Sequence, residues 1–315
     1  MHEPSLTIFL ACYNRPDYAR LAIRSVTNQT DHRFVFRISD NSTNDLVQQM
    51  VAAEFPTVDY VRRMPSTIAC THGNIIIDEC RTDHLMIMHD DDELTPNFVE
   101  EMLRFMTRFP DAGGYAANGP IIDETGNTIH DRFYRSGRKY HLISDPFWLA
   151  RRWFAYATFS VAPFPSYIYK RSVVGGMRFD TLKRGQYGDF VFVHQCLIRS
   201  RSVAWLNLPL YRYRSHSRQD SARITFSSYS RMKIYMREAQ PDYYGLRDFR
   251  IVRALHLIPV LGQRNRDRRR QELKKETIKA ILTSPGTVAR KFALLTLQAI
   301  DRLRVFARAK GSENV

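Results

Sequence analysis

Short apolar runs alternate with longer segments of helical pattern through the first third of the chain. Such runs predict strands, and the segments between them predict helices. The predicted strands are Leu6–Cys12, Phe34–Ile38, Val58–Arg62 and His84–Met88, and the predicted helices are 16–26, Leu46–Phe55, Gly73–Cys80 and Pro96–Phe109. Strands that alternate with helices pair in parallel. The pattern therefore predicts an α/β fold, with a Rossmann-like, mostly parallel sheet flanked by helices.

This arrangement also predicts where a ligand binds. Open parallel sheets bind ligands beyond the carboxyl ends of their strands. The segments that follow Cys12, Ile38 and Met88 should therefore converge on one crevice. A glycine-rich and aromatic middle region follows, in which periodicity gives little guidance. Regular patterns return with a strand at Ser166–Lys170, a helix at Asp189–Ser200 and a strand at Val203–Leu208.

Four consecutive acids, at positions 90–93, come directly after the predicted strand that ends at Met88. Like charges this close repel one another, and a bound divalent cation would compensate them. Oxygen ligands favour Mg²⁺ or Mn²⁺ over zinc. The alternative is an acidic first turn of the helix that begins near Pro96, where acids are favoured. The position after a buried strand favours the metal.

A second polar segment, Ser39-Asp40-Asn41-Ser42, follows the second predicted strand. The carboxylate of Asp40 could accept hydrogen bonds from a ribose or from the edge of a base. The same residue types also form turns and helix caps, so this segment alone is weak support for a nucleotide.

Five motifs, in this order, resemble family 2 of the inverting glycosyltransferases, which have the GT-A fold. They are Ala11-Cys12-Tyr13-Asn14-Arg15-Pro16, Ser39-Asp40-Asn41-Ser42, Asp90-Asp91-Asp92 with Pro96 following, Gly188-Asp189, and Tyr213-Arg214-Ser215-His216. The resemblance covers Leu6 to Ser221. It implies a catalytic domain at 1–225, with a nucleotide-binding half at 1–110 and an acceptor-binding half at 111–225. A helical, basic extension at 226–315 completes the chain.

The resemblance implies that a sugar is transferred from a nucleotide diphosphate sugar, with a UDP-sugar favoured. The acceptor would be a hydroxyl of a glycan or lipid-linked intermediate in cell-envelope polysaccharide synthesis. The implied site residues are Ala11, Tyr13, Asn14, Arg15, Asp40 and Asp90 for the nucleotide; Asp91, Asp92 and His216 for Mn²⁺ or Mg²⁺; Arg214, Arg218 and Gln219 for the diphosphate; and Trp148 and Trp153 for the acceptor.

The acid motif can be aligned with the family in two frames. Counting back from Pro96 makes Asp91 the first choice for the metal-binding carboxylate, and it places His89 where many members have an acid. The other frame pairs Asp90 with Asp92. Both frames stay open from the sequence.

Asp189 matches the family's catalytic base. It would take the proton from the acceptor hydroxyl as that oxygen attacks the anomeric carbon, in one displacement that inverts the centre. The family often has an acid where this chain has Gly188. An ordinary helix-capping aspartate is the alternative.

Positive charge is concentrated in the tail. The chain of 315 residues has a formal net charge of +15 and a pI near 9.8, and residues 246–310 hold 17 basic and 5 acidic side chains. Apolar residues recur at intervals of three and four from Thr287 to Ala309, which predicts an amphipathic helix with a basic side. Such a helix can lie on anionic lipid, or it can pack on its own domain or on a second subunit.

The remaining composition bears on location. The four cysteines, Cys12, Cys70, Cys80 and Cys196, are scattered singly, which is typical of a reducing compartment. The N-terminus lacks the pattern of a signal peptide, and the longest uncharged stretch is too short to span a bilayer. We therefore expect a cytoplasmic protein without a transmembrane helix, which could lie on the inner face of the plasma membrane.

Two other classes of function would account for part of the sequence. A nucleotidyltransferase would need a glycine-rich phosphate loop with a lysine after the first strand, and the segment Ala11–Pro16 contains no glycine. A basic nucleic-acid- or membrane-binding protein without catalysis would explain the run Arg264–Arg270. It would leave the acid cluster unexplained, because carboxylates repel phosphates. Nucleic acid is therefore not a favoured partner, and a homo-oligomer is left open.

Overall fold

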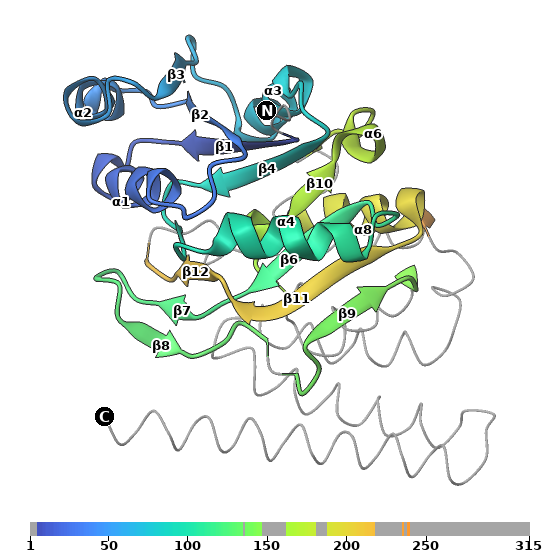
Figure 1. The fold of residues 1–315 in the computed structure, drawn as a ribbon. Helices are drawn as coiled ribbons and strands as arrows, with labels where there is room; N and C mark the ends of the chain where they lie inside the picture. The colour runs from blue at the N-terminus through green and yellow to red at the C-terminus, as the bar shows by residue number, and fades with distance from the viewer. Residues whose placement is uncertain are drawn as a thin grey trace, which may run out of the picture. The chain divides into compact units, whose positions relative to one another are not determined.

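The four N-terminal strands form one parallel array (Figure 1). The computed structural model describes residues 5–134, 136–146, 162–180, 188–217, 235 and 238–239. The strands are β1 (Leu6–Cys12), β2 (Val35–Asp40), β3 (Asp59–Arg62) and β4 (His84–His89), in the spatial order β3-β2-β1-β4. Helices α1 (Pro16–Thr27), α2 (Leu46–Glu54) and α3 (Ala69–Glu79) connect them. All three strand pairs are parallel, as the alternating pattern predicts.

The order of these strands creates a switch point between β1 and β4. The chain winds outward from β1 through β2 to β3 and then crosses to the other side of β1. Ligands of doubly wound sheets bind at such a point, beyond the carboxyl ends of the two strands. Strand β1 is an interior strand, and Leu6, Ile8 and Leu10 are fully buried. This burial explains why its sequence is continuously apolar.

The second half of the sheet is mixed. Past β4 come β10 (Ile168–Lys170), β6 (Gly114–Asn118), β11 (Val203–Pro209) and β9 (Tyr140–Ile143). Strand β10 is antiparallel to both β4 and β6, β11 is parallel to β6, and β9 is antiparallel to β11. The helical segments of this half are α4 (Phe98–Arg108), η1 (Phe164–Ser166), α6 (Arg171–Val174) and α8 (Gly188–Ser200). The predicted α/β class with a mostly parallel sheet is confirmed.

A small second sheet lies at the carboxyl end of β4. Its strands are β5 (Glu93–Leu94), β12 (Tyr211–Arg214), β7 (Ile121–Ile122) and β8 (Thr128–His130), in the order β5-β12-β7-β8. At Gly119, just before β7, a Cβ atom would lie 1.5 Å from the carbonyl oxygen of Tyr211. Only glycine permits this close approach of the two backbones. The small sheet brings the segment after β12 to the acid cluster.

Several expected elements differ in detail. Helix α3 begins at Ala69, before the expected start at Gly73, and the expected helix near Pro96 begins at Phe98. Strands β6 to β9 had no expected counterpart, because strands of two to five residues leave too few positions for periodicity to register. The alternative explanation of the acid tract as the first turn of a helix is wrong, since β5 separates the tract from α4.

Other expectations concern the chain as a whole. The chain divides into two units, Met1–Ala239 and Gln240–Val315, and the described residues belong to the first. The basic extension predicted at 226–315 lies outside the described residues apart from 235, 238 and 239. All four cysteines are buried free thiols. Within the described ranges, no helix is long and apolar enough to cross a membrane.

Candidate functional site

The acid cluster lies where the sequence predicts it, at the carboxyl end of β4 beside the end of β1. Strands β1 and β4 are paired in register, with Ala11 opposite His89. The next residues of each strand therefore enter the same region. Asp90, Asp91 and Asp92 are all buried, with exposed fractions of 0%, 6% and 1%. Three adjacent carboxyl groups are thus removed from water, and each needs its own compensation.

Arg15 compensates two of the three carboxyl groups. Its two terminal nitrogens lie 2.5 Å from Asp90 Oδ1 and 2.6 Å from Asp91 Oδ2. The backbone N–H of Tyr13 donates a further hydrogen bond of 2.8 Å to Asp90 Oδ2. Both donors come from the loop after β1. The predicted nucleotide-binding residues Tyr13 and Arg15 therefore both contact the third, Asp90.

The three aspartates differ in their affinity for protons. Burial raises the pKa of Asp90 to about 7, although Arg15 opposes the shift. Burial and the charge of Asp91 raise the pKa of Asp92 well above its usual range. Burial alone would also raise the pKa of Asp91, but Arg15, His89 and His216 outweigh it and hold that pKa below its usual value. Of the three, Asp91 is therefore the carboxyl group held most firmly in its ionised form at neutral pH.

His216 lies against Asp91, as the metal-site prediction requires. Its Nε2 atom is 2.9 Å from Asp91 Oδ2 and 3.3 Å from an Arg15 terminal nitrogen. The imidazole is 5.3 Å from the ring of Tyr18 on α1, measured between centroids. A second grouping overlaps this one: the ligand atoms of His89, Asp91 and Asp92 all lie within 4.8 Å of one another. A carboxylate oxygen and imidazole nitrogens form a donor set that suits Mn²⁺.

Asp92 is engaged by the small sheet. Its Oδ2 accepts a 2.7 Å hydrogen bond from the Tyr211 hydroxyl, and its Oδ1 accepts one of 2.8 Å from the backbone N–H of Arg214. Both oxygens are thus used to hold β12 against the end of β4. No pattern in the sequence predicts this contact, because Tyr211 is 119 residues from Asp92. Asp91 is left as the better-placed metal ligand of the two.

Arg214, predicted at the diphosphate, is 1% exposed and donates within the same region. Its Nε donates a hydrogen bond of 2.8 Å to the carbonyl oxygen of Asp91, and one terminal nitrogen donates a hydrogen bond of 2.9 Å to the carbonyl oxygen of Asp123. The other terminal nitrogen is paired with Glu93. A contact with a diphosphate would require some of these bonds to be exchanged.

The turn after β2 is built around Asp40. This carboxylate is fully buried; its Oδ1 accepts a 2.9 Å hydrogen bond from the backbone N–H of Ser42, and its Oδ2 accepts one of 2.6 Å from the Tyr60 hydroxyl. Tyr60, on β3, was not anticipated, since nothing in the local sequence relates it to Asp40. The predicted contact between Asp40 and a base would require the hydrogen bond between the Tyr60 hydroxyl and Asp40 Oδ2 to break.

Two loop residues join the turns after β1 and β2. Asn14 has a φ of 57°, a left-handed conformation that asparagine tolerates better than most residues. Its N–H donates 2.8 Å to Ser42 Oγ, and its Oδ1 accepts 2.9 Å from the N–H of Thr43. The neighbouring Tyr13 is 48% exposed, and its ring is available to a base. Ala11, also predicted at the nucleotide, is the residue before the last of β1 and lies opposite Ser39.

Asp189, the predicted base, lies in the first turn of α8. Its Oδ1 accepts a 2.7 Å hydrogen bond from the N–H of Phe190, and the residue as a whole is half-buried. Burial by the surrounding protein raises its pKa to about 6. At the preceding Gly188, a Cβ atom would meet nothing within 4 Å among the described residues.

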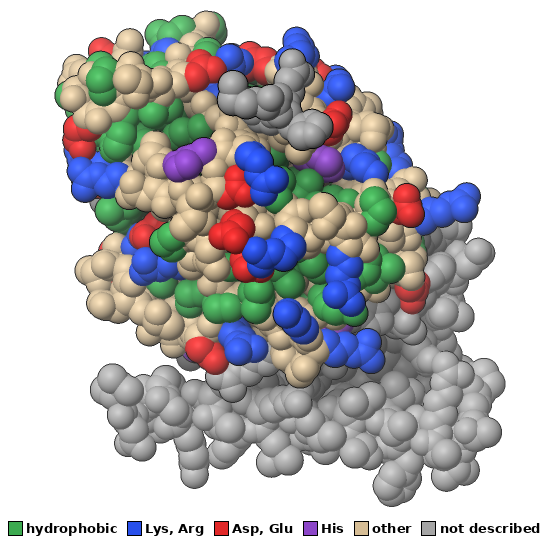
Figure 2. Space-filling view, in the orientation of Figure 1, with side chains coloured by type: hydrophobic (Ala, Val, Ile, Leu, Met, Phe, Trp, Pro, Cys, Tyr) green, Lys and Arg blue, Asp and Glu red, His purple; other side chains and the backbone are tan. Residues whose placement is uncertain are grey.

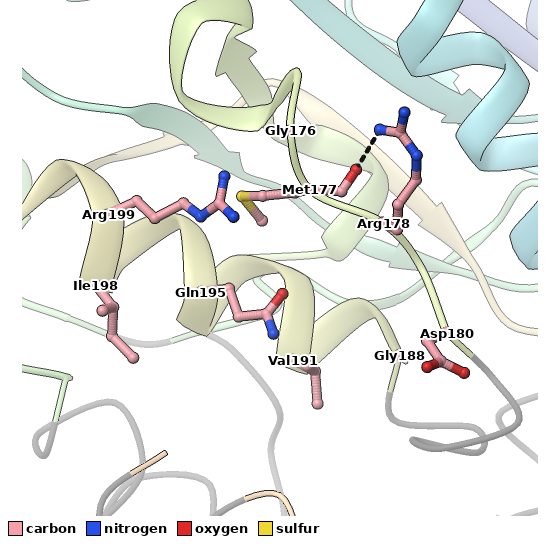
Figure 3. Close-up of a pocket in the computed structure, with 9 residues that line it drawn as sticks. All are labelled: Gly176, Met177, Arg178, Asp180, Gly188, Val191, Gln195, Ile198 and Arg199. Carbon is pink, nitrogen blue, oxygen red and sulfur yellow. Dashed lines mark hydrogen bonds between the residues drawn. The ribbon is translucent and has the colours of Figure 1, made fainter. Parts of the chain in front are cut away.

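A cavity of about 340 Å³ lies between α8 and the segment 176–180, which follows α6 (Figure 3). Figure 3 shows that Val191, Gln195 and Ile198 line it from α8, and Gly188 lies at its edge. At 3.6 residues per turn, these three side chains lie on a different face of α8 from Asp189. The cavity is therefore not the place where the predicted base would meet its substrate.

Four predicted site residues fall outside the described residues. They are Trp148 and Trp153, predicted at the acceptor, and Arg218 and Gln219, predicted at the diphosphate. The described surface also bears on the nucleic-acid alternative. Figure 2 shows basic side chains interleaved with acidic ones on this face, and not gathered into one basic patch. A polyanion would meet both signs of charge there.

Comparisons with known proteins agree with this geometry. The family model described as glycosyl transferase family 2 matches residues 7–168. A Bacillus subtilis (strain 168) protein named "Putative glycosyltransferase EpsH" is 25% identical over 229 residues, which is 69% of this chain and 62% of the relative. The Escherichia coli (strain K12) protein "Putative colanic acid biosynthesis glycosyl transferase WcaA" is 27% identical over 131 residues, 39% of this chain and 47% of that one. The chain thus spans less than two thirds of either relative.

Solved structures share the fold. The crystal structure of S. aureus TarS in complex with UDP-GlcNAc matches with a TM-score of 0.61 and 11% identity, covering 88% of this chain and 81% of that one. The same protein in complex with UDP matches with a TM-score of 0.55 over 85% of this chain and 70% of that one, also at 11% identity. At 11% identity, these matches show that the fold is shared.

Proposed function

The chain belongs to glycosyl transferase family 2, and from this premise we propose that it transfers a sugar from a nucleotide diphosphate sugar to an acceptor hydroxyl with inversion. A UDP-sugar is the favoured donor, because the structural neighbour TarS is described in complex with UDP and with UDP-GlcNAc. A glycan or lipid-linked intermediate of polysaccharide synthesis is the favoured acceptor, because the name of the relative WcaA refers to colanic acid biosynthesis.

The observation that carries this proposal is the charged Asp91 beside His216 at the switch point of the sheet. The two atoms that face each other, Asp91 Oδ2 and His216 Nε2, are 2.9 Å apart. Donor atoms this close can serve one ion together, so the residues fit a divalent metal. Asp91 and His216 would hold Mn²⁺ or Mg²⁺, with His89 and Asp92 as the neighbouring candidates. The bound ion would supply positive charge for the departing diphosphate.

The chain's own residues supply the remaining functions. The exposed ring of Tyr13 would stack on the base, and Asn14 would fix the loop between the turns after β1 and β2. Asp189 would take the proton of the acceptor hydroxyl as its oxygen attacks the anomeric carbon. Since its pKa is raised to about 6, it is ionised at neutral pH and still basic enough to accept that proton. One displacement of this kind inverts the anomeric centre.

The two other functions are not favoured. A nucleotidyltransferase would need phosphate contacts from a glycine-rich loop after β1, where Asn14 and Arg15 contact Ser42 and the aspartates instead. A non-catalytic nucleic-acid-binding protein leaves the buried acid cluster without a role. A cytoplasmic location with the basic extension on anionic lipid remains part of the proposal, as does association into oligomers.

Thermal unfolding of the full chain tests the proposal first. Mn²⁺ together with one of UDP, GDP or dTDP should raise the unfolding midpoint, because a ligand that binds only the native state stabilises it. Asp91→Asn should abolish the effect of the metal. Asp83→Asn is a suitable control, because Asp83 precedes β4 at the opposite end of the strand. If none of the nucleotides shifts the midpoint of the wild type, the transferase proposal is contradicted.

A further inference from the structure

The guanidinium of Arg15 lies among the atoms that a metal ion would use. One terminal nitrogen is 2.6 Å from Asp91 Oδ2 and 3.3 Å from His216 Nε2, the two atoms proposed above as metal ligands. The other terminal nitrogen is 2.5 Å from Asp90 Oδ1. Arg15 therefore contacts both proposed ligands at once and supplies the positive charge that the buried aspartates require.

The Arg15 guanidinium and a divalent ion cannot both bind closely to Asp91 Oδ2 and His216 Nε2. Asp91 Oδ2 already receives Arg15 at 2.6 Å and His216 at 2.9 Å. A divalent ion drawn to the same oxygen and the same imidazole nitrogen would be repelled by the guanidinium beside it, in a buried setting where charges are poorly screened. Binding of the ion thus requires Arg15 to move away from Asp91.

The backbone of Arg15 is fixed, but its side chain can move away from the aspartates toward solvent. It precedes Pro16, the first residue of α1, so its main chain is held by the helix start. Its side chain is 25% exposed, while Asp90 is fully buried. A rotation of the side chain can therefore carry the guanidinium toward solvent without moving α1. An anion outside the cluster would favour this rotation, and the planar fork of arginine suits a diphosphate.

We propose that Arg15 is the resident cation of the donor-free site and is exchanged for the divalent ion when the diphosphate of the donor draws its guanidinium outward. This inference rests on the function proposed above. Diphosphate and metal then bind cooperatively, because each of them favours the movement of the Arg15 side chain away from Asp91. The metal binds weakly while Arg15 neutralises the aspartates, and tightly once the donor has engaged Arg15. By linkage, the metal must strengthen donor binding by the same factor.

Mn²⁺ binding to the full chain tests the exchange directly, with the free ion followed by electron paramagnetic resonance and without any turnover. In the absence of nucleotide, Arg15→Gln should bind Mn²⁺ at least about tenfold more tightly than the wild type, a coupling within the usual range between linked sites. Addition of UDP should tighten Mn²⁺ binding in the wild type and add little in Arg15→Gln. Arg20→Gln is the matched control, since Arg20 lies on the same helix and pairs with Glu54 and Asp17.

A second pair of variants separates the roles of charge and shape. Arg15→Lys keeps a positive charge but lacks the fork. It should bind Mn²⁺ about as weakly as the wild type without nucleotide, and it should lose most of the tightening by UDP. The double variant Arg15→Gln with Asp91→Asn should lose the tight Mn²⁺ site, which shows that the gained affinity belongs to this cluster.

Stability must be followed alongside, because Arg15→Gln leaves buried carboxylates without their partner. Circular dichroism establishes the folded fraction, and Mn²⁺ alone should raise the unfolding midpoint more in Arg15→Gln than in the wild type. A folded Arg15→Gln that binds Mn²⁺ no more tightly than the wild type overturns the exchange, and weaker binding would show that Arg15 instead orients Asp91. The absence of nucleotide binding in every variant would count against the proposed function, while the comparison with metal alone would still decide the exchange.

Discussion

Asp90, Asp91 and Asp92 are residues of the same type, but their side chains lie in three different environments. Asp90 pairs with Arg15 and the N–H of Tyr13, Asp91 faces His216, and Asp92 is bonded to β12. Because burial raises the pKa values of Asp90 and Asp92 while the neighbouring cations lower that of Asp91, only the middle residue is kept strongly acidic. The negative charge at the proposed metal site therefore depends mainly on Asp91.

The base proposed at Asp189 makes a prediction about pH. Burial raises the pKa of this carboxyl to about 6, and only its ionised form accepts a proton. The value of kcat/KM should therefore be constant above this pH and fall below it, approaching tenfold per pH unit. Initial rates of nucleoside diphosphate release across the range measure this. Asp189→Asn should lower kcat by about 10²- to 10⁴-fold with little change in donor binding. Full activity in Asp189→Asn would remove it from the mechanism.

At the scale of elements, β12 is held to β4 by a hydrogen bond between Tyr211 and Asp92. The Tyr211 side chain is fully buried, and its hydroxyl donates 2.7 Å to Asp92 Oδ2. Tyr211→Phe should lower the free energy of unfolding by about 1–3 kcal/mol, because a buried carboxyl loses its partner. Denaturant unfolding measures the change. Tyr13→Phe, at an exposed ring, should leave stability unchanged, and equal stability of both variants would contradict the tether.

The crossing of β12 and the segment before β7 depends on Gly119. A Cβ atom there would lie 1.5 Å from the Tyr211 carbonyl oxygen, so the backbones must separate if a methyl group is added. Gly119→Ala should destabilise the fold by about 1–3 kcal/mol or more, as other overpacked sites do. At Gly137 a Cβ atom meets nothing within 4 Å of the described residues, and Gly137→Ala should be nearly neutral. Thermal unfolding of the two variants makes the comparison.

At the scale of the whole molecule, the excess of positive charge belongs largely to the tail. If the basic extension binds anionic lipid, the full chain should co-sediment with vesicles that contain phosphatidylserine and should dissociate as salt is added. Substituting Arg268, Arg269 and Arg270 by glutamine should weaken this binding by about 1 kcal/mol per charge removed. The matched control substitutes Arg20, Arg33 and Arg104, which are surface residues of the first unit. Binding that is unaffected by the first set would locate the lipid contact elsewhere.

The sequence by itself determined the elements and the place of the site. Short continuous apolar runs such as Leu6–Cys12 indicate interior strands, and a helix after each one indicates parallel pairing, so the ends of β1 and β4 were expected to meet, as they do. The acids after Met88 followed from their position along that pattern, whereas the base candidate Asp189 came from the resemblance to the glycosyltransferase family. The strands from β6 to β9 could not be found in this way, because they are too short to show a period and exist through pairing with distant strands.

Only the tertiary structure decided what each site residue contacts. Asp91 and Asp92 cannot be told apart by spacing, but Tyr211 and Arg214 engage one and His216 faces the other. Likewise, nothing in the sequence indicates that Arg15, rather than another arginine, neutralises the aspartates. The fold makes it the counter-charge of Asp90 and Asp91, of which Asp91 is 76 residues further along the chain. The physical reason is that periodicity records which face of an element is buried, whereas pKa and ligand position depend on side chains that the fold brings together from distant segments.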